Sequence, residues 1–254
     1  MQAEPAIRVR DLTYAYPGGG PALAGTTFDV AEGESVGLVG PNGAGKTTLF
    51  LCLAGVLPSR KGSIRVAGLD PSDREQRRRL PAAVGIVFPS SDDQIFNATV
   101  FDDVAFGPLN LGLPPDEVRR RVAEALERVG LTGYEGRVPF HLSGGEKRRV
   151  ALAGVLAMRP GVLLLDEPST HLDPRGRREF IRLVNGLPGT KVIASHDLEL
   201  ILQTCRRVLV LDHGKIVADG PARAVLADAA LMEAHGLEVP HSLTPHAPTD
   251  RHHE

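Results

Sequence analysis

The segment GPNGAGKT occupies residues 40–47, between an apolar, β-branched run (SVGLV, 35–39) and a run of helical character (TTLFLCLAG, 47–55). Glycines in such a turn let consecutive backbone N–H groups point inward, and the following helix directs its positive end to the same place. In this setting the pattern GxxxxGK[ST] predicts a loop that binds phosphate groups, rather than an ordinary glycine-rich turn.

Residues of this loop have expected tasks in binding ATP. Lys46 should bridge the β- and γ-phosphates, and the Thr47 hydroxyl should ligate Mg²⁺. The nucleotide-binding residues predicted along the segment are Gly40, Pro41, Asn42, Gly43, Ala44, Gly45, Lys46, Thr47 and Thr48.

A second element, VLLLDE at 162–167, reads as a buried strand that ends in two acids. Asp166 is expected to hold Mg²⁺ through water, and Glu167 to orient and polarise the attacking water as a catalytic residue. Such a run is by itself an ordinary strand end. Its pairing with the phosphate loop indicates nucleotide hydrolysis.

Short apolar runs alternate with helical patterns along the chain, which favours an α/β domain built on a largely parallel sheet. The first residues, IRVRDLTYAYPGG (7–19), alternate and then break, which predicts an antiparallel lead-in. Further strands are predicted at 26–30, 35–40, 64–68, 84–88, 162–167, 191–195 and 207–212, and a closing helix at about 222–234.

The character of the chain changes from about residue 90 to residue 150, where β-branched runs are few. Apolar residues recur there at helical spacing and end at Gly130; they are Val118, Val122, Ala125, Leu126 and Val129. We therefore expect an α-helical lobe inserted in the sheet domain.

Bulk composition narrows the class of protein. The 254 residues are 42% hydrophobic, and the formal charge of −2 with a pI near 6.5 argues against nucleic acid as a partner. The two cysteines, Cys52 and Cys205, are far apart, which suggests packing thiols in a reducing cytoplasm. We expect no signal peptide, and no apolar run approaches the roughly 20 residues that span a membrane.

The segment Leu142-Ser143-Gly144-Gly145-Glu146 precedes the helical run EKRRVALAGVLAM. It resembles the signature motif of ABC ATPases, a family whose fold is a P-loop NTPase (RecA-like) core with an antiparallel β lead-in and an inserted helical subdomain. The resemblance covers about residues 7–238, which implies an ABC ATPase domain over 1–239 and a flexible His-rich tail over 240–254. In that family the signature of one subunit covers the γ-phosphate held by its partner, so a homo- or heterodimer of nucleotide-binding subunits is implied.

Three further positions match the same family. Tyr16 corresponds to the aromatic residue that stacks on adenine, although an exposed tyrosine before Pro17 is also an ordinary turn residue. Asp173, in Leu172-Asp173-Pro174, resembles the D-loop that communicates across the dimer. His196, after the run KVIAS, matches the switch histidine that contacts the γ-phosphate and orients the catalytic water; a structural histidine is the alternative.

Within the family, the stretches DDQIF (92–96), VFDDVAFGP (100–108) and AHGLEVP (234–240) are similar to the energy-coupling-factor group, above all to its cobalt and nickel ATPases. In that group the first two form a groove for a coupling helix that carries arginines. Four acids could meet those charges or simply favour a helix start: Asp92, Asp93, Asp102 and Asp103. The implied partners are a transmembrane coupling subunit and a substrate-binding membrane subunit, at the cytoplasmic face of the membrane.

Two features depart from or extend this pattern. Pro89 stands where the family has a glutamine that touches Mg²⁺, and Gln94 matches a later glutamine. We hypothesise that water or the hydroxyls of Ser90 or Ser91 replace the missing contact. Five histidines near the C-terminus suit Ni²⁺, Co²⁺ or Zn²⁺ in a flexible tract, or belong to a solvated tail; they are His235, His241, His246, His252 and His253.

The sequence thus predicts an ATP-hydrolysing subunit that powers an importer of cobalt or nickel ions. A vitamin importer of the same group is one alternative. A soluble ABC ATPase of DNA repair or translation is another, but the chain lacks the coiled-coil insertion or the second nucleotide domain of such proteins. A small-molecule kinase with the same phosphate loop would not need the LSGGE segment.

Overall fold

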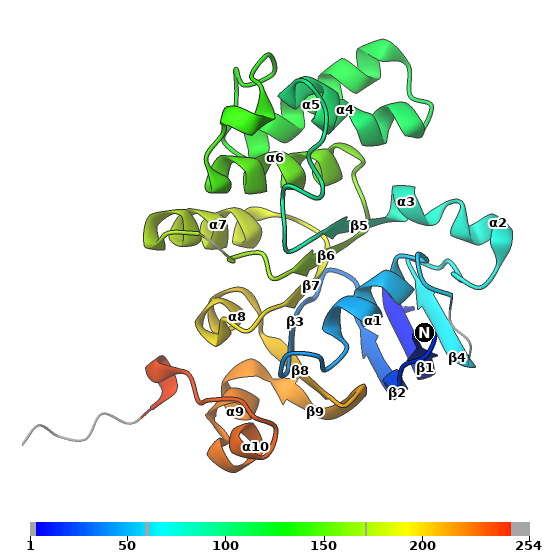
Figure 1. Cartoon of the computed structure of the whole chain (residues 1–254), viewed down its shortest axis with the longest axis vertical. Coiled ribbons are helices and arrows are strands. Elements are labelled where there is room, and N and C mark those ends of the chain that lie inside the picture. Colours follow the sequence, from blue (N-terminus) through cyan, green and yellow to red (C-terminus); the bar gives the residue numbers. More distant parts are fainter. Residues whose placement is uncertain (1–3, 59–60, 171, 245–254) are drawn as a thin grey trace, which may run out of the picture.

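The computed structural model of the chain describes residues 4–58, 61–170 and 172–244 (Figure 1). In these ranges the largest sheet has six strands in the order β5-β6-β7-β3-β8-β9. Their bounds are β3 Ser35–Val39, β5 Val84–Val87, β6 Val162–Asp166, β7 Thr190–Ala194, β8 Arg207–Asp212 and β9 Lys215–Pro221. All neighbours pair in parallel except β8 and β9. Continuous apolar runs such as β6 are buried along their whole length because helices cover both faces of a parallel sheet.

The lead-in predicted from the N-terminal residues is a second, antiparallel sheet of order β2-β1-β4. Its strands are β1 Ile7–Ala15, β2 Pro21–Val30 and β4 Lys61–Val66. Alternation along β1 buries Ile7, Val9 and Leu12 in one cluster with Leu49 and Phe50 of helix α1 (Lys46–Leu53). The small sheet therefore covers the helix that follows the phosphate loop, as Figure 1 shows.

Three helices form a lobe at the end of the molecule opposite to α9 and α10 (Figure 1). They are α4 Val100–Asn110, α5 Pro115–Arg128 and α6 Gly144–Ala157, with a 3₁₀ turn at Pro139–His141 before α6. The lobe was expected over about 90–150, and α6 extends seven residues beyond Val150 to Ala157. The apolar face predicted for α5 is buried, because it packs on α4 and α6.

The remaining helices lie outside the lobe, and the closing helix differs from the prediction. They are α2 Arg74–Arg77, α3 Leu80–Ala83, α7 Pro174–Gly186, α8 Leu198–Thr204, α9 Ala222–Ala227 and α10 Ala229–Ala234. The closing helix predicted over 222–234 is divided at Asp228, whose backbone is extended (ψ 94°) and whose carboxylate accepts a hydrogen bond from the N–H of Leu231. Aspartate often caps helices in this way, so the division has a local cause.

The start of the predicted His-rich tail contacts the body of the protein. The backbone N–H and the hydroxyl of Ser242 both donate to the Glu199 carboxylate at 2.9 Å. His235 Nδ1 lies 2.8 Å from Asp212 Oδ2 at the end of β8. His246, His252 and His253 lie outside the described residues. The described part of the chain holds no group of three or more His, Cys, Asp or Glu side chains arranged to bind a metal ion.

Close packing of β5 against α6 joins the lobe to the sheet. A Cβ atom added at Gly85 would overlap Cγ1 of Val155 and lie 2.9 Å from Cγ of Pro160. Neither neighbour is the free end of a flexible side chain, so any larger residue at 85 must push the lobe and strand apart.

We predict that Gly85→Ala lowers the free energy of unfolding by about 1–3 kcal/mol, because an overpacked core position strains its neighbours. Urea denaturation of the full chain measures this loss. Gly186→Ala is the matched control, since a Cβ there meets nothing within 4 Å, and it should change stability by less than about 1 kcal/mol. Equal stability of both variants would contradict the prediction.

Candidate active site

The predicted phosphate loop joins β3 to α1 in a conformation that requires glycine. Gly40, Gly43 and Gly45 have φ angles of 155°, 79° and 109°. A Cβ at Gly40 would overlap the carbonyl oxygen of Leu211, and one at Gly45 would overlap that of Ala22. Without side chains these glycines lie against neighbouring backbone, and of the loop's N–H groups that of Ala44 donates to the Pro41 carbonyl at 3.2 Å, close to the start of α1.

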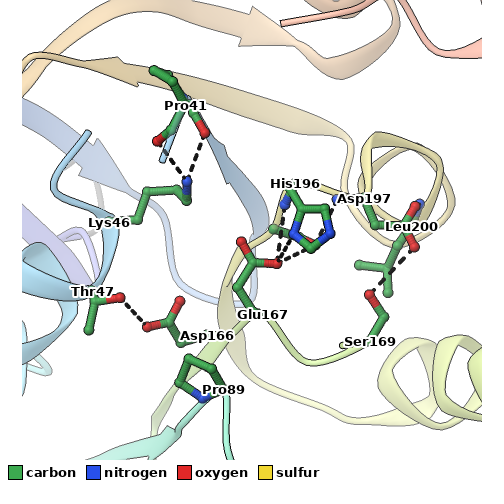
Figure 2. Close-up of polar contacts among 12 residues, drawn as sticks. Pro41, Lys46, Thr47, Pro89, Asp166, Glu167, Ser169, His196, Asp197 and Leu200 are labelled. Carbon is green, nitrogen blue, oxygen red and sulfur yellow. Dashed lines mark hydrogen bonds and ion pairs between the residues drawn. The ribbon is translucent and has the colours of Figure 1, made fainter. Parts of the chain in front are cut away.

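Lys46 contacts the backbone of this loop through its side chain. Its Nζ donates to the carbonyl oxygens of Gly40 at 2.7 Å and Pro41 at 3.1 Å (Figure 2). The residue is only 8% exposed, and burial lowers the pKa of its ammonium group while Glu167 and Asp166 oppose that shift. The Lys46 side chain therefore helps to hold the backbone of the loop in its conformation.

Beside the loop lies a cavity of about 370 Å³. The predicted residues Asn42 to Thr48 line it, with Tyr16, Ala22, Asp166 and Glu167. Tyr16 is 43% exposed, packs edge-on against the ring of Tyr14 and lies with its hydroxyl 3.2 Å from that of Thr48. An aromatic ring therefore stands at the same cavity as the phosphate loop.

Two acids at the end of β6 face the loop. Asp166 is 1% exposed, and its Oδ2 accepts a hydrogen bond of 2.6 Å from the Thr47 hydroxyl. Burial raises the pKa of Asp166; the Thr47 hydrogen bond opposes this, and the adjacent Glu167 carboxylate adds to it. Glu167 itself has a left-handed backbone (φ 46°), and its N–H donates to the carbonyl of Ala194 on β7 at 2.8 Å.

The structure brings Glu167 and His196 together. Glu167 Oε2 lies 2.7 Å from His196 Nδ1 and accepts hydrogen bonds of 3.2 Å from the His196 N–H and the Ser195 hydroxyl (Figure 2). The next residue, Asp197, forms a double ion pair with Arg177 of α7 at 2.5 and 2.8 Å. The loop after β7 is thus fixed beside the carboxylate, while the His196 ring stays 67% exposed.

The segment Leu142–Glu146 begins α6 with a capping box. The backbone N–H of Glu146 donates to the Ser143 hydroxyl at 3.3 Å, and Glu146 Oε2 accepts from the Ser143 N–H at 2.8 Å. Tyr134 donates its hydroxyl to the other oxygen of Glu146 at 2.8 Å. Together these bonds lower the pKa of Glu146, and none of the residues 142–146 lines the cavity beside the phosphate loop.

Asp173 also lies away from that cavity. Its carboxylate caps α7 by accepting a hydrogen bond of 2.6 Å from the N–H of Gly176. The described residues therefore form two separate groups: the loop with the two acids and His196, and the two capped helix starts at 143 and 173.

Comparison with known proteins matches residues 23–170 to the family model described as ABC transporter. The chain belongs to the ABC transporter family. Its P-loop NTPase fold confirms the fold class that the sequence predicted, and it is an ATPase of that family.

Individual relatives within the family are similar over most of the chain. The energy-coupling factor transporter ATP-binding protein EcfA of Methanothermobacter thermautotrophicus is 50% identical over 239 residues, which are 92% of this chain and 76% of that protein. Among solved structures, cbiO1 from Clostridium perfringens, part of the ABC transporter complex cbiONQ, is 37% identical with a TM-score of 0.81 over 91% of this chain and 94% of that one. The bacterial ABC transporter cassette MJ0796, solved as a dimer, is 25% identical with a TM-score of 0.76 over 85% of this chain and 98% of that one.

No helix in the described ranges has the length and apolar character needed to cross a bilayer.

The ABC ATPase also carries a buried residue that the sequence analysis did not single out. Arg148 of α6 is buried and donates to the carbonyls of Phe88 and Pro89. Arg148 shares a helical face with Leu152 and Val155, which indicates burial, but nothing in the sequence indicates its partners at 88–89.

The structure also places the glutamine that the sequence left without a role. Gln94 Nε2 donates to the Ile86 carbonyl at 2.9 Å, and its Oε1 accepts from the Phe88 N–H at 3.0 Å. Its amide is therefore used to hold the end of β5. Ser90 and Ser91 do not line the phosphate-loop cavity, so their positions give no support to the hypothesis that their hydroxyls replace the missing glutamine.

We predict that Glu146→Gln lowers the stability of the chain at neutral pH by about 0.5–2 kcal/mol, because glutamine keeps an acceptor but loses the charge that strengthens the bonds from Ser143 and Tyr134. A carboxylate whose pKa is lowered by folding stabilises the fold at pH values above its ordinary pKa of 4.5. This stabilisation is lost as the pH falls through the lowered pKa. The difference between wild type and variant should therefore shrink below pH 4.5.

Urea unfolding across pH 7 to pH 3 checks this dependence. Glu127→Gln, at an exposed position of α5, is the control and should show no comparable difference. A Glu146→Gln effect that stays constant in acid would show that the carboxylate charge does not act as described.

Proposed function

We propose that this ATPase powers an importer of the energy-coupling-factor type from the cytoplasmic face of the membrane, with cobalt or nickel ions as cargo. The observation that carries the proposal is the contact between Glu167 and His196 at the edge of the phosphate-loop cavity. The relatives named EcfA and cbiO1 support the transporter type. The cargo is supported by the likeness of residues 92–108 and 234–240 to cobalt and nickel ATPases.

The cavity offers partners for both ends of an ATP molecule, the adenine and the phosphates. Tyr16 offers a ring face for adenine, and backbone N–H groups within residues 42–48, with the Lys46 ammonium group, receive the phosphates. When phosphates enter, Lys46 Nζ exchanges its two carbonyl partners for phosphate oxygens. That exchange leaves the backbone of the loop in place, because the glycine contacts hold it.

Magnesium fits the residues present. The Thr47 hydroxyl and the Asp166 carboxylate are hard oxygen donors whose atoms already lie 2.6 Å apart. These two residues would hold Mg²⁺, which neutralises charge on the phosphate oxygens when bound. Burial raises the pKa of Asp166, and a cation bound beside it would favour the ionised carboxylate.

Hydrolysis is assigned to Glu167 and His196. Glu167 accepts a hydrogen bond from the attacking water and polarises it. The His196 ring holds Glu167 Oε2 in position through its Nδ1 atom. The Ser195 hydroxyl and the His196 N–H support the same oxygen. A carboxylate held by three donors presents its other oxygen in a defined direction.

A second nucleotide-binding subunit completes the site. The residues 142–146 lie outside the chain's own cavity, although Ser143, Gly144 and Gly145 form a capped helix start suited to an anion. In a head-to-tail pair, each α6 start would meet the γ-phosphate held by the other protomer, with Asp173 at the contact between them. The dimer of the cassette MJ0796 is consistent with such pairing.

We predict that Glu167→Gln retains ATP binding but lowers ATP hydrolysis by about 10²–10⁴-fold, the range typical of a lost general base. The variant should accumulate as an ATP-bound dimer, alone or with a sister subunit. Phosphate release and size-exclusion chromatography with and without ATP measure both effects.

Lys46→Ala is the paired variant and should lose ATP binding and dimer formation together. Hydrolysis at the wild-type rate in Glu167→Gln would reject the assignment of Glu167. Absence of Mg²⁺-dependent phosphate release from wild type in its assembled complex would reject the proposed function.

We assign the binding site for the membrane subunit to a groove of about 420 Å³ on the lobe. Phe96 and Phe106 stand edge to face at its rim with 5.1 Å between ring centroids, and both are exposed. Of the four acids singled out in the sequence, Asp92 pairs with Lys147 at 2.7 Å and Asp102 bonds to the capping hydroxyl of Thr99. Asp93 and Asp103 line the groove.

Asp103 is the best acceptor for an arginine of a coupling subunit. Its Oδ1 accepts from the N–H groups of Phe96 and Asn97 and from Asn97 Nδ2, all at 3.0 Å. Its Oδ2 is buried and has no partner among the described residues. A buried carboxylate oxygen without a donor is costly, and a guanidinium would remove that cost.

We predict that Asp103→Asn weakens assembly with the membrane coupling subunit by about tenfold or more, because it removes one member of a buried charge pair. Asparagine keeps an Oδ1 acceptor for the loop at 96–97, so ATP binding should be unchanged. Asp102→Asn, on the same helix turn but outside the groove, should assemble normally. Equal copurification of both variants with the membrane subunits would reject the pairing.

A further inference from the structure

A buried guanidinium connects the lobe to the loop after β5. Arg148 lies on the second turn of α6 and is 3% exposed. Its Nη1 donates to the Phe88 carbonyl at 2.5 Å, and its Nη2 donates to the Pro89 carbonyl. Both acceptors belong to the main chain, so this contact does not depend on which side chain occupies position 89.

The positive charge of Arg148 is balanced by the nearby negative charge of Asp166. Burial lowers the pKa of Arg148, and the negative charge of Asp166 opposes that shift. In return, Arg148 counteracts the burial that raises the pKa of Asp166. Removing one member of such a buried set leaves the others uncompensated, which costs more than an exposed ion pair does.

A continuous path runs from the start of α6 to the acidic strand end. Arg148 holds the carbonyls of Phe88 and Pro89, which directly follow β5, and Val87 of β5 pairs with Leu165 of β6. The next residue of β6 is Asp166, and Figure 2 shows Pro89 beside it. Gln94 clamps the same strand end from its own loop.

We propose that Arg148 is a positioning residue that couples the helix carrying the segment 142–146 to the acidic strand end. It does so through the backbone carbonyls of Phe88 and Pro89, so the link is made although position 89 has no polar side chain. A movement of α6 toward a partner-bound nucleotide then pulls on the loop next to Asp166. This inference rests on the proposed function, because it concerns hydrolysis at the same site.

Arg148→Met in the full-length chain tests the proposal, since methionine fills similar space without donors or charge. The expected result is a kcat for ATP hydrolysis at least about tenfold lower, with KM and the affinity for a fluorescent ATP analogue changed less than about threefold. Arg148→Lys keeps the charge but loses the planar fork, so it should restore part of kcat.

Arg159→Met is the matched control, because Arg159 follows α6 but pairs with Glu124 on the surface; its kinetics should equal those of wild type. Thermal unfolding is measured for every variant. A wild-type kcat in Arg148→Met with only a lower melting temperature would overturn the proposal, as would an equal loss of kcat and affinity.

If Arg148→Met does not fold, Arg148→Lys decides alone. A kcat equal to that of wild type overturns the coupling role, whereas an intermediate kcat with wild-type affinity supports it. Failure of the proposed function would be distinguishable, because it would appear as absent hydrolysis in the wild-type chain itself.

Discussion

Mutual neutralisation of buried charges at the carboxyl ends of the parallel strands is the constraint on which this site depends. Lys46, Asp166 and Arg148 are each nearly inaccessible to water. Burial lowers the pKa of Lys46 and of Arg148, and it raises the pKa of Asp166. With Glu167 included, the two positive and two negative groups cancel. None of them could be buried alone at an acceptable cost, so the phosphate loop, the strand end and the lobe helix must come together as a unit.

The sequence predicted the parts of this arrangement that are encoded locally. The phosphate loop needs glycines at fixed offsets because its backbone touches Leu211 and Ala22, and that requirement is visible in the motif. The runs predicted as strands are strands, since continuous apolar stretches have no other place in a covered parallel sheet. Strand β9 was missed because its exposed, alternating residues carry only a weak apolar signal.

Properties that depend on distant segments could not be predicted in the same way. Asp92, Asp93, Asp102 and Asp103 look equivalent in sequence, yet Asp92 pairs with Lys147, Asp102 accepts a hydrogen bond from the helix-capping Thr99, and the other two line a groove. Arg148 reads as one more basic residue in EKRR until the loop at 88–89 is folded beneath it.

The attachment of Ser242 to Glu199 has a consequence for the surface beside the phosphate loop. The two hydrogen bonds hold the segment before Ser242 in place, and residues 236–241 line a cavity of about 480 Å³ together with Gly40, Pro41, Asn42 and His196. A segment far away from the loop in sequence thus contributes to the surface that a second subunit would have to approach. Substitutions in residues 236–241 would therefore alter the fit between two subunits without touching the nucleotide-binding residues themselves.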